Sequence, residues 1–337
     1  MTAPARCSPA WKRRFHATAS CCRPGPLRPL ESASRPARGP PDIQAFKEAA
    51  LAPGRPFLFR AGAGSPTAKL PAAHQWFSHD AAWRALTPRV AAYESHPFPY
   101  ELVQPCSSKR QAVLGFRDWL MQSSSMIDRI MAGILQSTLA EGQGHQFSQL
   151  DGPLGLLTKA LEFNQVQHSK GLSTLELYIA QCSLTDLPPP LQEDLPTPEL
   201  VLRAGKGDVY NSSIWLGTEP TYTPLHRDPN PNLFCQLCGT KTIRLLPPAS
   251  GDRLYFEVQV KIRRHGNSRI RTTEMMEGEE RTVLHNAVWA NTEPLDDLHE
   301  ADLGPGDALF IPDGWWHSVR SIGEAGQLNG SVNWWFR

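Results

Sequence analysis

Two side chains that can bind a metal stand two positions apart in the second half of the sequence. His226 and Asp228 are separated by one arginine, and prolines follow at positions 229 and 231. In a β-strand, residues i and i+2 point to the same face, so the imidazole and the carboxylate could reach one point in space. The prolines would end strand pairing directly afterwards. A surface turn is the alternative, because aspartate, asparagine and proline are also favoured in turns.

A third ligand of a suitable type stands close to the end of the chain. His317 follows a predicted turn at Asp313-Gly314 and lies in an apolar stretch. Two histidines and one carboxylate on one face of an octahedral metal leave three positions open, which is the ligand set of non-haem Fe(II) oxygenases. We therefore expect His317 on a strand beside that of His226. The alternative is a core histidine that is hydrogen-bonded to the backbone.

A lysine inside a predicted strand gives a second chemical signal. Lys241 begins the inward-facing set Lys241, Ile243 and Leu245. A lysine at this position needs a buried anion opposite its ammonium group. The alternative is a lysine at a strand end whose aliphatic chain lets the charge reach water.

The elements that must position these side chains are short strands. Pro, Gly and Asn separate many apolar stretches in the second half of the chain, which predicts a sandwich or a barrel. The predicted strands cover residues 174–181, 208–216, 222–228, 233–237, 241–246, 308–312, 315–319 and 331–337. Residues 256–262 also alternate, and with a turn at 265–267 they predict a hairpin. This hairpin would carry the basic side chains of Lys261, Arg263, Arg264, Arg269 and Arg271.

The first half of the chain is predicted to contain more helix. Apolar periodicity and capping residues predict helices at 42–50, after Ser107 or Ser108, around 127–135 and at 153–163. Short strands are expected at 56–60 and 89–93, and a loop at 141–151.

The composition is that of a globular protein. The 337 residues are 40% hydrophobic with a formal net charge of +1, so the global charge does not indicate a nucleic-acid or membrane partner. No apolar run approaches the ~18 residues of a membrane span. The seven cysteines lack the spacing of a secreted scaffold, which favours a reducing compartment. Cys235 and Cys238 match Cys-x-x-Cys, but on a strand they would face opposite sides, which disfavours a zinc or redox pair.

The N-terminal residues differ from the rest of the chain. Residues 1–40 contain eight basic side chains against one acid, Glu31, and serine, alanine and proline fill the gaps. This is the composition of a transit peptide, so residues 1–36 are interpreted as a mitochondrial presequence outside the fold. The alternative is a disordered basic tail on a cytoplasmic or nuclear protein.

Several motifs together resemble a known family. They are Tyr178-Ile-Ala-Gln181, Ile214-Trp-Leu-Gly217, the stretch from Thr223 to Leu233, Gln236-Leu-Cys-Gly-Thr-Lys241, the stretch from Gly306 to His317, and Ser331-Val-Asn333-Trp-Trp. In this order they are similar to the JmjC-domain 2-oxoglutarate-dependent oxygenases, especially the small-hydroxylase branch that includes factor inhibiting HIF. The strong matches cover residues 175–337.

The resemblance implies a fold and a site. The fold would be mainly β with flanking helices, around a double-stranded β-helix of the jelly-roll, cupin-like type. Residues 175–337 would form the catalytic core, and residues 37–174 a helical and strand extension packed on it. His226, Asp228 and His317 would bind Fe(II).

The cosubstrate 2-oxoglutarate would contact a further set of residues. Lys241, Tyr178 and Thr223 would bind its distal carboxylate, Asn232 would lie at its metal-proximal end, and Asn333 would lie near the site. Trp215 and Trp316 would be wall or core residues, and Gln181 could point toward the substrate.

The implied activity is a dioxygenase reaction, most simply hydroxylation of a protein side chain. A tRNA- or RNA-modifying hydroxylase is the second hypothesis, with the basic hairpin as its binding surface. A jelly-roll module that binds metal without turnover is the third. The absence of chromatin-reader modules disfavours a histone demethylase. The chain ends after the last predicted strand, without the C-terminal helices of the asparaginyl hydroxylase, which favours a monomer.

Overall fold

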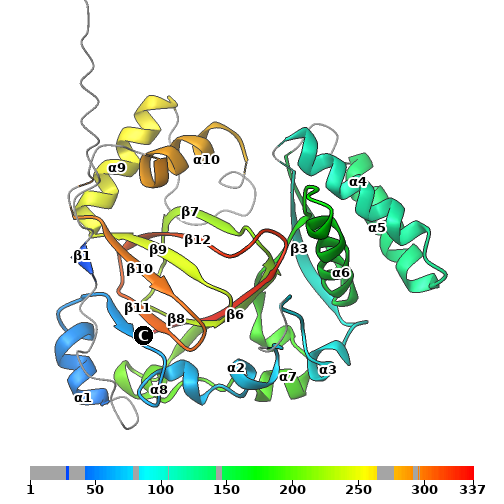
Figure 1. The fold of residues 1–337 in the computed structure, drawn as a ribbon. Helices are drawn as coiled ribbons and strands as arrows, with labels where there is room; N and C mark the ends of the chain where they lie inside the picture. The colour runs from blue at the N-terminus through cyan, green and yellow to red at the C-terminus, as the bar shows by residue number, and fades with distance from the viewer. Residues whose placement is uncertain are drawn as a thin grey trace, which may run out of the picture.

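Two antiparallel sheets form the framework of the protein (Figure 1). The computed structural model describes residues 28–29, 42–78, 83–104, 106–141, 146–263, 277–290, 295 and 297–337. The smaller sheet has the order β1-β10-β9-β12-β7, in which β1 and β10 are parallel. Its strands are β1 Arg28–Pro29, β7 Tyr222–Arg227, β9 Lys241–Leu246, β10 His299–Leu303 and β12 Trp316–Ser321. Apart from β1, the predicted presequence lies outside the described residues.

The larger sheet joins the two halves of the sequence. Its order is β2-β11-β8-β13-β6-β5-β3-β4. Its strands are β2 Phe57–Phe59, β3 Pro97–Val103, β4 Phe147–Pro153, β5 Glu176–Ser183, β6 Val209–Thr218, β8 Asn232–Cys238, β11 Ala308–Ile311 and β13 Leu328–Phe336. Strands β2, β3 and β4 precede residue 175, yet β2 pairs with β11 and β3 pairs with β5. Strands of the extension are therefore hydrogen-bonded to strands of the core. The domain boundary at residue 174 stays a prediction.

Helices cover the outer faces of both sheets (Figure 1). Helices α9 Pro248–Lys261 and α10 Gly278–His285 pack on the smaller sheet through the buried side chains of Leu225, Leu246, Tyr255, Val258 and Trp316, among others. The larger sheet packs against α4 Ser107–Met121, α5 Met126–Glu141 and α6 Gly155–Ser169. The remaining α-helices are α1 Ile43–Phe46, α2 Pro71–Gln75, α3 Pro88–Ala91, α7 Pro189–Glu193 and α8 Glu199–Ala204. No helix in the described ranges is long and apolar enough to cross a membrane.

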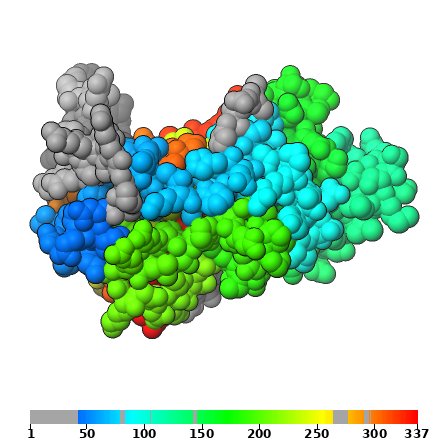
Figure 2. Space-filling view, turned by 90° about the horizontal axis from the view of Figure 1, so that it is seen from below, coloured from blue at the N-terminus to red at the C-terminus, as the bar shows by residue number. Residues whose placement is uncertain are grey.

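A buried carboxylate ties the early helices to the region around α7. Asp194 accepts hydrogen bonds from Trp76 Nε1 at 2.8 Å and from Arg89 Nε at 2.6 Å, and its carbonyl accepts from the Ala72 amide. Seen from below, the blue early segments lie directly beside the green ones (Figure 2). This contact fixes the N-terminal segments that cover the larger sheet.

The space between the sheets holds a separate apolar cluster and the candidate site. Ile243 and Leu245 of β9 contact Leu309 and Ile311 of β11 within this cluster. Alternation along β9 places Lys241 on the same inner face, as the sequence predicted. The sandwich with flanking helices confirms the predicted fold class of a cupin-like jelly roll.

The predicted hairpin at 256–262 is wrong. Residues 256–261 belong to α9, and Ile262 is its C-cap. The helix begins with Pro248, and in the first turn the missing N–H of a proline breaks no helical hydrogen bond. Helical spacing buries Val258 and Ile262, whereas Phe256 and Val260 are exposed. Val258 and Ile262 are four residues apart, so they share a face in a strand and in a helix. Alternation alone therefore could not distinguish the two structures. The return strand through Ile270 lies outside the described residues.

Two shorter predictions in the first half are also wrong. Residues 88–91 form helix α3 where a strand was expected, because Pro88 starts a helical turn after Thr87. The predicted loop at 141–151 contains β4 from Phe147, which pairs with β3 in continuous register. Neighbouring strands supply this pairing, and local composition does not reveal it.

Candidate metal centre

The two predicted histidine ligands are cross-strand neighbours. His226 on β7 pairs with His317 on β12, and their ring centroids lie 4.1 Å apart. Side chains directly opposite each other on an antiparallel pair face the same side. Both rings therefore point into the space between the sheets, where each residue is 3% exposed.

The aspartate joins them from just beyond the strand. β7 ends at Arg227, so Asp228 is the first residue after it. Asp228 Oδ1 lies 3.7 Å from His226 Nε2, and Oδ2 lies 3.5 Å from His317 Nε2. Among the described residues, these three offer ligand atoms that all lie within 4.8 Å of one another. Asn232 Nδ2 donates to Asp228 Oδ2 at 2.8 Å and holds the carboxylate in this position.

Each histidine contacts the backbone carbonyl two residues before it in the chain. His226 Nδ1 lies 2.8 Å from the Pro224 carbonyl, and His317 Nδ1 lies 3.4 Å from the Trp315 carbonyl. Such contacts leave Nε2 free to bind a metal. Burial, and then the charge of His317, lower the pKa of His226 to about 4. The neutral imidazole that a metal requires is therefore the stable form, so the donor set fits a divalent cation with an open face.

A buried ammonium lies at the other end of the same pocket. Lys241 is 2% exposed, and its Nζ donates to Ser331 Oγ at 2.7 Å and to Tyr178 OH at 3.3 Å. The rings of Tyr178 and Phe234 lie 5.7 and 5.5 Å from Nζ. Burial lowers the pKa of Lys241 to about 7, while the charge of Glu219 opposes this shift. The predicted anion contact thus has a buried donor that lies beside hydroxyl groups.

Every predicted site residue lines this one pocket. The lining residues are Tyr178, Trp215, Thr221, Thr223, His226, Asp228, Asn232, Phe234, Lys241, His317, Val319, Asn333 and Trp335. Asn333 links two of the others, because its Oδ1 accepts from Trp215 Nε1 at 2.7 Å and its Nδ2 donates to Asn232 Oδ1 at 3.2 Å. Trp316 instead packs in the cluster below α9.

Sequence reasoning assigned no role to Ser331, Thr221, Phe234, Val319 and Trp335. Ser331 contacts the lysine directly, and the other four line the pocket. The usable signal was the two-residue spacing between Ser331 and Asn333 on a predicted strand, which places both on one face.

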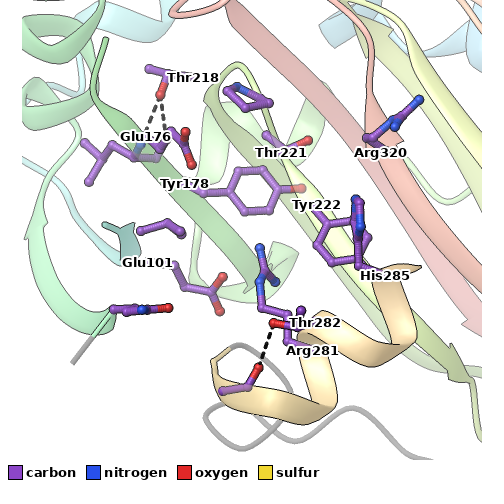
Figure 3. A pocket seen from close by; sticks show the side chains of 15 residues that line it. Glu101, Glu176, Tyr178, Thr218, Thr221, Tyr222, Arg281, Thr282, His285 and Arg320 are labelled. Atoms are coloured by element: carbon purple, nitrogen blue, oxygen red, sulfur yellow. Dashed lines mark hydrogen bonds between the residues drawn. The ribbon is translucent and has the colours of Figure 1, made fainter. Parts of the chain in front are cut away.

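Two larger cavities adjoin the metal pocket and share lining residues with it. One has a volume of about 400 Å³ and lies between α10 and strands β3 and β5 (Figure 3). Glu101 and Arg281 extend into it from opposite walls, and Tyr178 separates it from the metal pocket. The other has a volume of about 290 Å³ and shares Tyr178, Trp215 and Thr223 with the metal pocket. Both cavities therefore border the pocket that holds the triad.

The second cavity has an acidic and aromatic wall. Glu101 and Asp151 line it together with Tyr100, Tyr178 and Trp215, and none of its described lining residues is basic. Burial raises the pKa of Glu101 to about 7, and Arg281 opposes the shift.

Gln181 lines the same cavity, where the sequence had placed it toward a substrate. Its φ of 52° accompanies a register shift in β5. The shift turns its side chain out of the regular alternation.

The Cys-x-x-Cys motif does not form a metal site with these groups. Cys235 and Cys238 lie on β8 and are buried free thiols. Burial raises the pKa of each to about 12, so neither offers a thiolate near neutral pH. The structure is consistent with the prediction that disfavoured a zinc or redox pair.

Two histidines and one carboxylate inside a jelly roll define a cupin-type metal-binding protein. A model of the cupin-like domain matches residues 44–337, so the chain belongs to the cupin-like domain family. This match and the JmjC relatives confirm the predicted family. JmjC proteins use Fe(II) and 2-oxoglutarate, and the triad provides a metal site of the matching type.

Curated relatives support the same family. The chain is 32% identical over 160 residues to lysine-specific demethylase 8 of Danio rerio, which covers 47% of this chain and 36% of that protein. It is 32% identical over 158 residues to JmjC domain-containing protein D of Dictyostelium discoideum, with 44% and 33% covered. Lysine-specific demethylase JMJ30 of Arabidopsis thaliana is 27% identical over 205 residues, with 58% and 41% covered. The chain thus spans about a third to two fifths of these relatives' length.

Proposed function

We propose that the protein is an Fe(II)- and 2-oxoglutarate-dependent oxygenase that acts on a protein side chain. The observation that carries this proposal is the presence of the triad and the buried Lys241 in one pocket. When bound, Fe(II) and 2-oxoglutarate supply dioxygen activation, with release of succinate and carbon dioxide and insertion of one oxygen atom into a C–H bond. The protein contributes positioning and exclusion of water.

Each end of the pocket would bind one part of this machinery. The triad would hold the metal, with Asn232 and Asn333 keeping the Asp228 carboxylate in place. Lys241 and Tyr178 would bind the distal carboxylate of 2-oxoglutarate, with the Ser331 hydroxyl beside them. Thr223, which was predicted to bind the same carboxylate, also lines the pocket. The free space at the triad is about 30 Å³, so binding of the cosubstrate requires a rearrangement of side chains that line the pocket.

The acidic cavity supports a substrate with a cationic side chain. Its carboxylates would attract an ammonium or guanidinium, and its aromatic faces stabilise such cations. Some relatives are named lysine-specific demethylases, an outcome that the sequence disfavoured for this chain. Removal of an N-methyl group begins with its hydroxylation, so both outcomes use the same chemistry. We therefore propose a basic protein side chain as the substrate.

The other two hypotheses have less support. The RNA hypothesis, which came from the family resemblance, used a basic hairpin as the binding surface. The part of this segment that the structure describes is the end of helix α9 and the two residues after it. A module without turnover would not need a buried lysine beside an open-faced metal triad.

The proposal can be tested without knowledge of the substrate. Addition of Fe(II) and 2-oxoglutarate under nitrogen should give a weak visible charge-transfer band, and air should then produce succinate slowly. His226→Ala should remove both signals, whereas the surface variant His168→Ala should keep them. A folded wild-type protein that shows neither signal would rule out the oxygenase.

We also propose import into mitochondria, on the basic and acid-poor composition of residues 1–36. These residues fused to a fluorescent protein should direct it to mitochondria, and a fusion with its arginines replaced by glutamine should stay in the cytosol. Identical distribution of the two fusions in the cell would exclude mitochondrial targeting by the basic residues of this segment.

A further inference from the structure

The last strand carries three buried polar side chains, and each holds a different group. Asn329, Ser331 and Asn333 alternate along β13, so they share one face. None is more than 2% exposed. Asn333 supports the metal end, Ser331 accepts from Lys241, and Asn329 Nδ2 donates to Glu219 Oε1 at 2.8 Å. The third contact involves a carboxylate that has no role in the function proposed above.

Glu219 has the features of a fixed buried charge. Its exposed fraction is 0%, and within the described part of the chain its Oε2 is buried without a hydrogen-bond partner. Its amide donates to the Gln327 carbonyl, and its carbonyl accepts from the Gly326 amide, both at 2.8 Å. A Cβ at Gly323 would lie 2.5 Å from Oε1, so the chain leaves space only for the carboxylate. Burial of a carboxylate with unused acceptor capacity is costly unless an opposite charge lies near.

Two cations are candidates for this role: the Arg84 guanidinium, whose Nη2 borders the same space beside Gly323 as Glu219 Oε1, and the Lys241 ammonium, on which the charge of Glu219 acts. Two residues of strand advance by about 6.6 Å, so the groups held by Asn329 and Ser331 lie about one such step apart. Asn329 Nδ2 also lies 3.3 Å from the carbonyl of Thr240, the residue before Lys241. The charge of Glu219 is the influence that raises the pKa of Lys241 against burial.

We propose that Glu219 is the resident counter-charge of Lys241, which keeps the ammonium protonated until the distal carboxylate of 2-oxoglutarate arrives. Glu219 is a positioning residue, because it acts through Lys241 without lining the metal pocket. The inference rests on the proposed function of Lys241. It assigns the lysine end of the site a charge partner that is distant in sequence.

The pH dependence of cosubstrate binding follows from this arrangement. The groups around Lys241 are Tyr178 on β5, whose hydroxyl it contacts, Glu219 before β7, whose charge acts on it, and the metal triad, which lines the same pocket. The Arg84 guanidinium lies beside Glu219. The Lys241 ammonium loses its proton as pH rises through about 7. Above that pH, affinity for 2-oxoglutarate should fall by about tenfold per pH unit, because only the charged form attracts the carboxylate. Loss of the Glu219 charge should move this decline to lower pH.

The test is calorimetric titration of 2-oxoglutarate into Mn(II)-loaded protein between pH 5.5 and 9. Glu219→Gln keeps the size of the side chain and removes its charge, and it should move the midpoint of the decline by about one pH unit. Lys241→Arg stays charged throughout this range, so its binding should lose the decline, and Glu219→Gln should add no shift in that background. Glu280→Gln, which removes another buried carboxylate, is the matched control and should leave the midpoint unchanged.

Each outcome has one meaning. Wild-type protein that binds no 2-oxoglutarate would overturn the proposed function itself. Wild-type protein that shows the decline, together with a folded Glu219→Gln variant of unchanged midpoint, would overturn only the counter-charge. If Glu219→Gln does not fold, Asn329→Ala takes its place, because it releases the carboxylate from its position and should move the midpoint the same way. An unchanged midpoint in a folded Asn329→Ala variant would likewise reject the proposal.

Discussion

The two ends of the metal pocket bury titratable groups in opposite ways. At the metal end, two histidines contact backbone carbonyls two residues before them in the chain, and burial lowers the pKa of His226 to about 4. At the other end, Lys241 is held by hydroxyls from β5 and β13, and burial lowers its pKa to about 7. Burial favours the neutral form in both cases.

The two ends differ in the protonation state that ligand binding requires. A metal binds the neutral imidazole, so burial prepares the metal end for its ligand. An anion needs the charged ammonium, so burial works against the lysine end, and a counter-charge has to compensate. The metal end is therefore preorganised by local contacts, whereas the lysine end depends on residues from distant strands.

Removal of a metal ligand should have the largest effect. Because the triad has only three protein ligands, His226→Ala or His317→Ala should lower Mn(II) affinity by more than about 100-fold. Calorimetric titration of Mn(II) measures this directly. Near-wild-type Mn(II) affinity in either folded variant would contradict the assignment of these histidines as metal ligands. His96→Ala is the control and should bind Mn(II) as wild type does.

Neutralisation of the lysine should affect the anion and spare the metal. Lys241→Met keeps the length and apolar contacts of the side chain, so affinity for 2-oxoglutarate should fall by about 100-fold with little change in Mn(II) affinity. The two affinities are measured on the same protein preparation. Loss of both 2-oxoglutarate and Mn(II) affinity in this variant would show that the two ends of the pocket do not bind their ligands independently.

The sequence revealed the metal end more completely than the lysine end. The spacing of His226 and Asp228, and the turn before His317, are local patterns that predict ligands on neighbouring strands. Lys241 could be placed inward from the alternation of β9 alone. Ser331 and Glu219 could not be assigned to it, because their proximity follows from the pairing of β13 with β8 and β6.

The same limit explains the errors in secondary structure. The alternation at 256–262 fits a strand and a helix equally well until α9 is seen packed on the smaller sheet. Strand β4 depends on pairing with β3, and its own residues carry weak strand signals. Short apolar stretches and close turns in the second half of the chain predicted a sandwich or barrel, and the resemblance to the JmjC family implied the jelly roll.

Loss of the asparagine behind the triad should give an intermediate effect. Asn333→Ala removes both the donor to Asn232 and the acceptor for Trp215, so the Asp228 carboxylate is less firmly held. Mn(II) affinity should fall by roughly 10- to 100-fold, as for other residues that orient metal ligands. Unchanged metal affinity in a folded variant would limit Asn333 to a structural role. Ser183→Ala on β5, outside the pocket, serves as the control.

The buried lysine should also make the stability of the metal-free protein depend on pH. Lys241 has a folded pKa of about 7 against an ordinary value of 10.5. Between these values the unfolded chain binds the additional proton, so stability should rise with pH by up to roughly 1.4 kcal/mol per unit. Below pH 7 both states are protonated and the contribution is constant. Urea unfolding at pH 6 to 9 should show this slope in wild type and in Lys170→Met, an exposed control, but not in Lys241→Met.

The smallest expected effect concerns the binding of a substrate in the acidic cavity, where burial also changes the charge of a titratable group. Burial raises the pKa of Glu101 to about 7, so this carboxyl is neutral below that pH and charged above it. Binding of a lysine-containing peptide to Mn(II)-loaded protein should therefore strengthen by up to about tenfold as pH rises from 6 to 8. Fluorescence anisotropy should show a smaller rise for Glu101→Gln. Glu176→Gln is the matched control, because that carboxylate is already paired with Lys109 at 2.8 Å. An equal rise in Glu101→Gln would show that the cavity does not select a cation through Glu101.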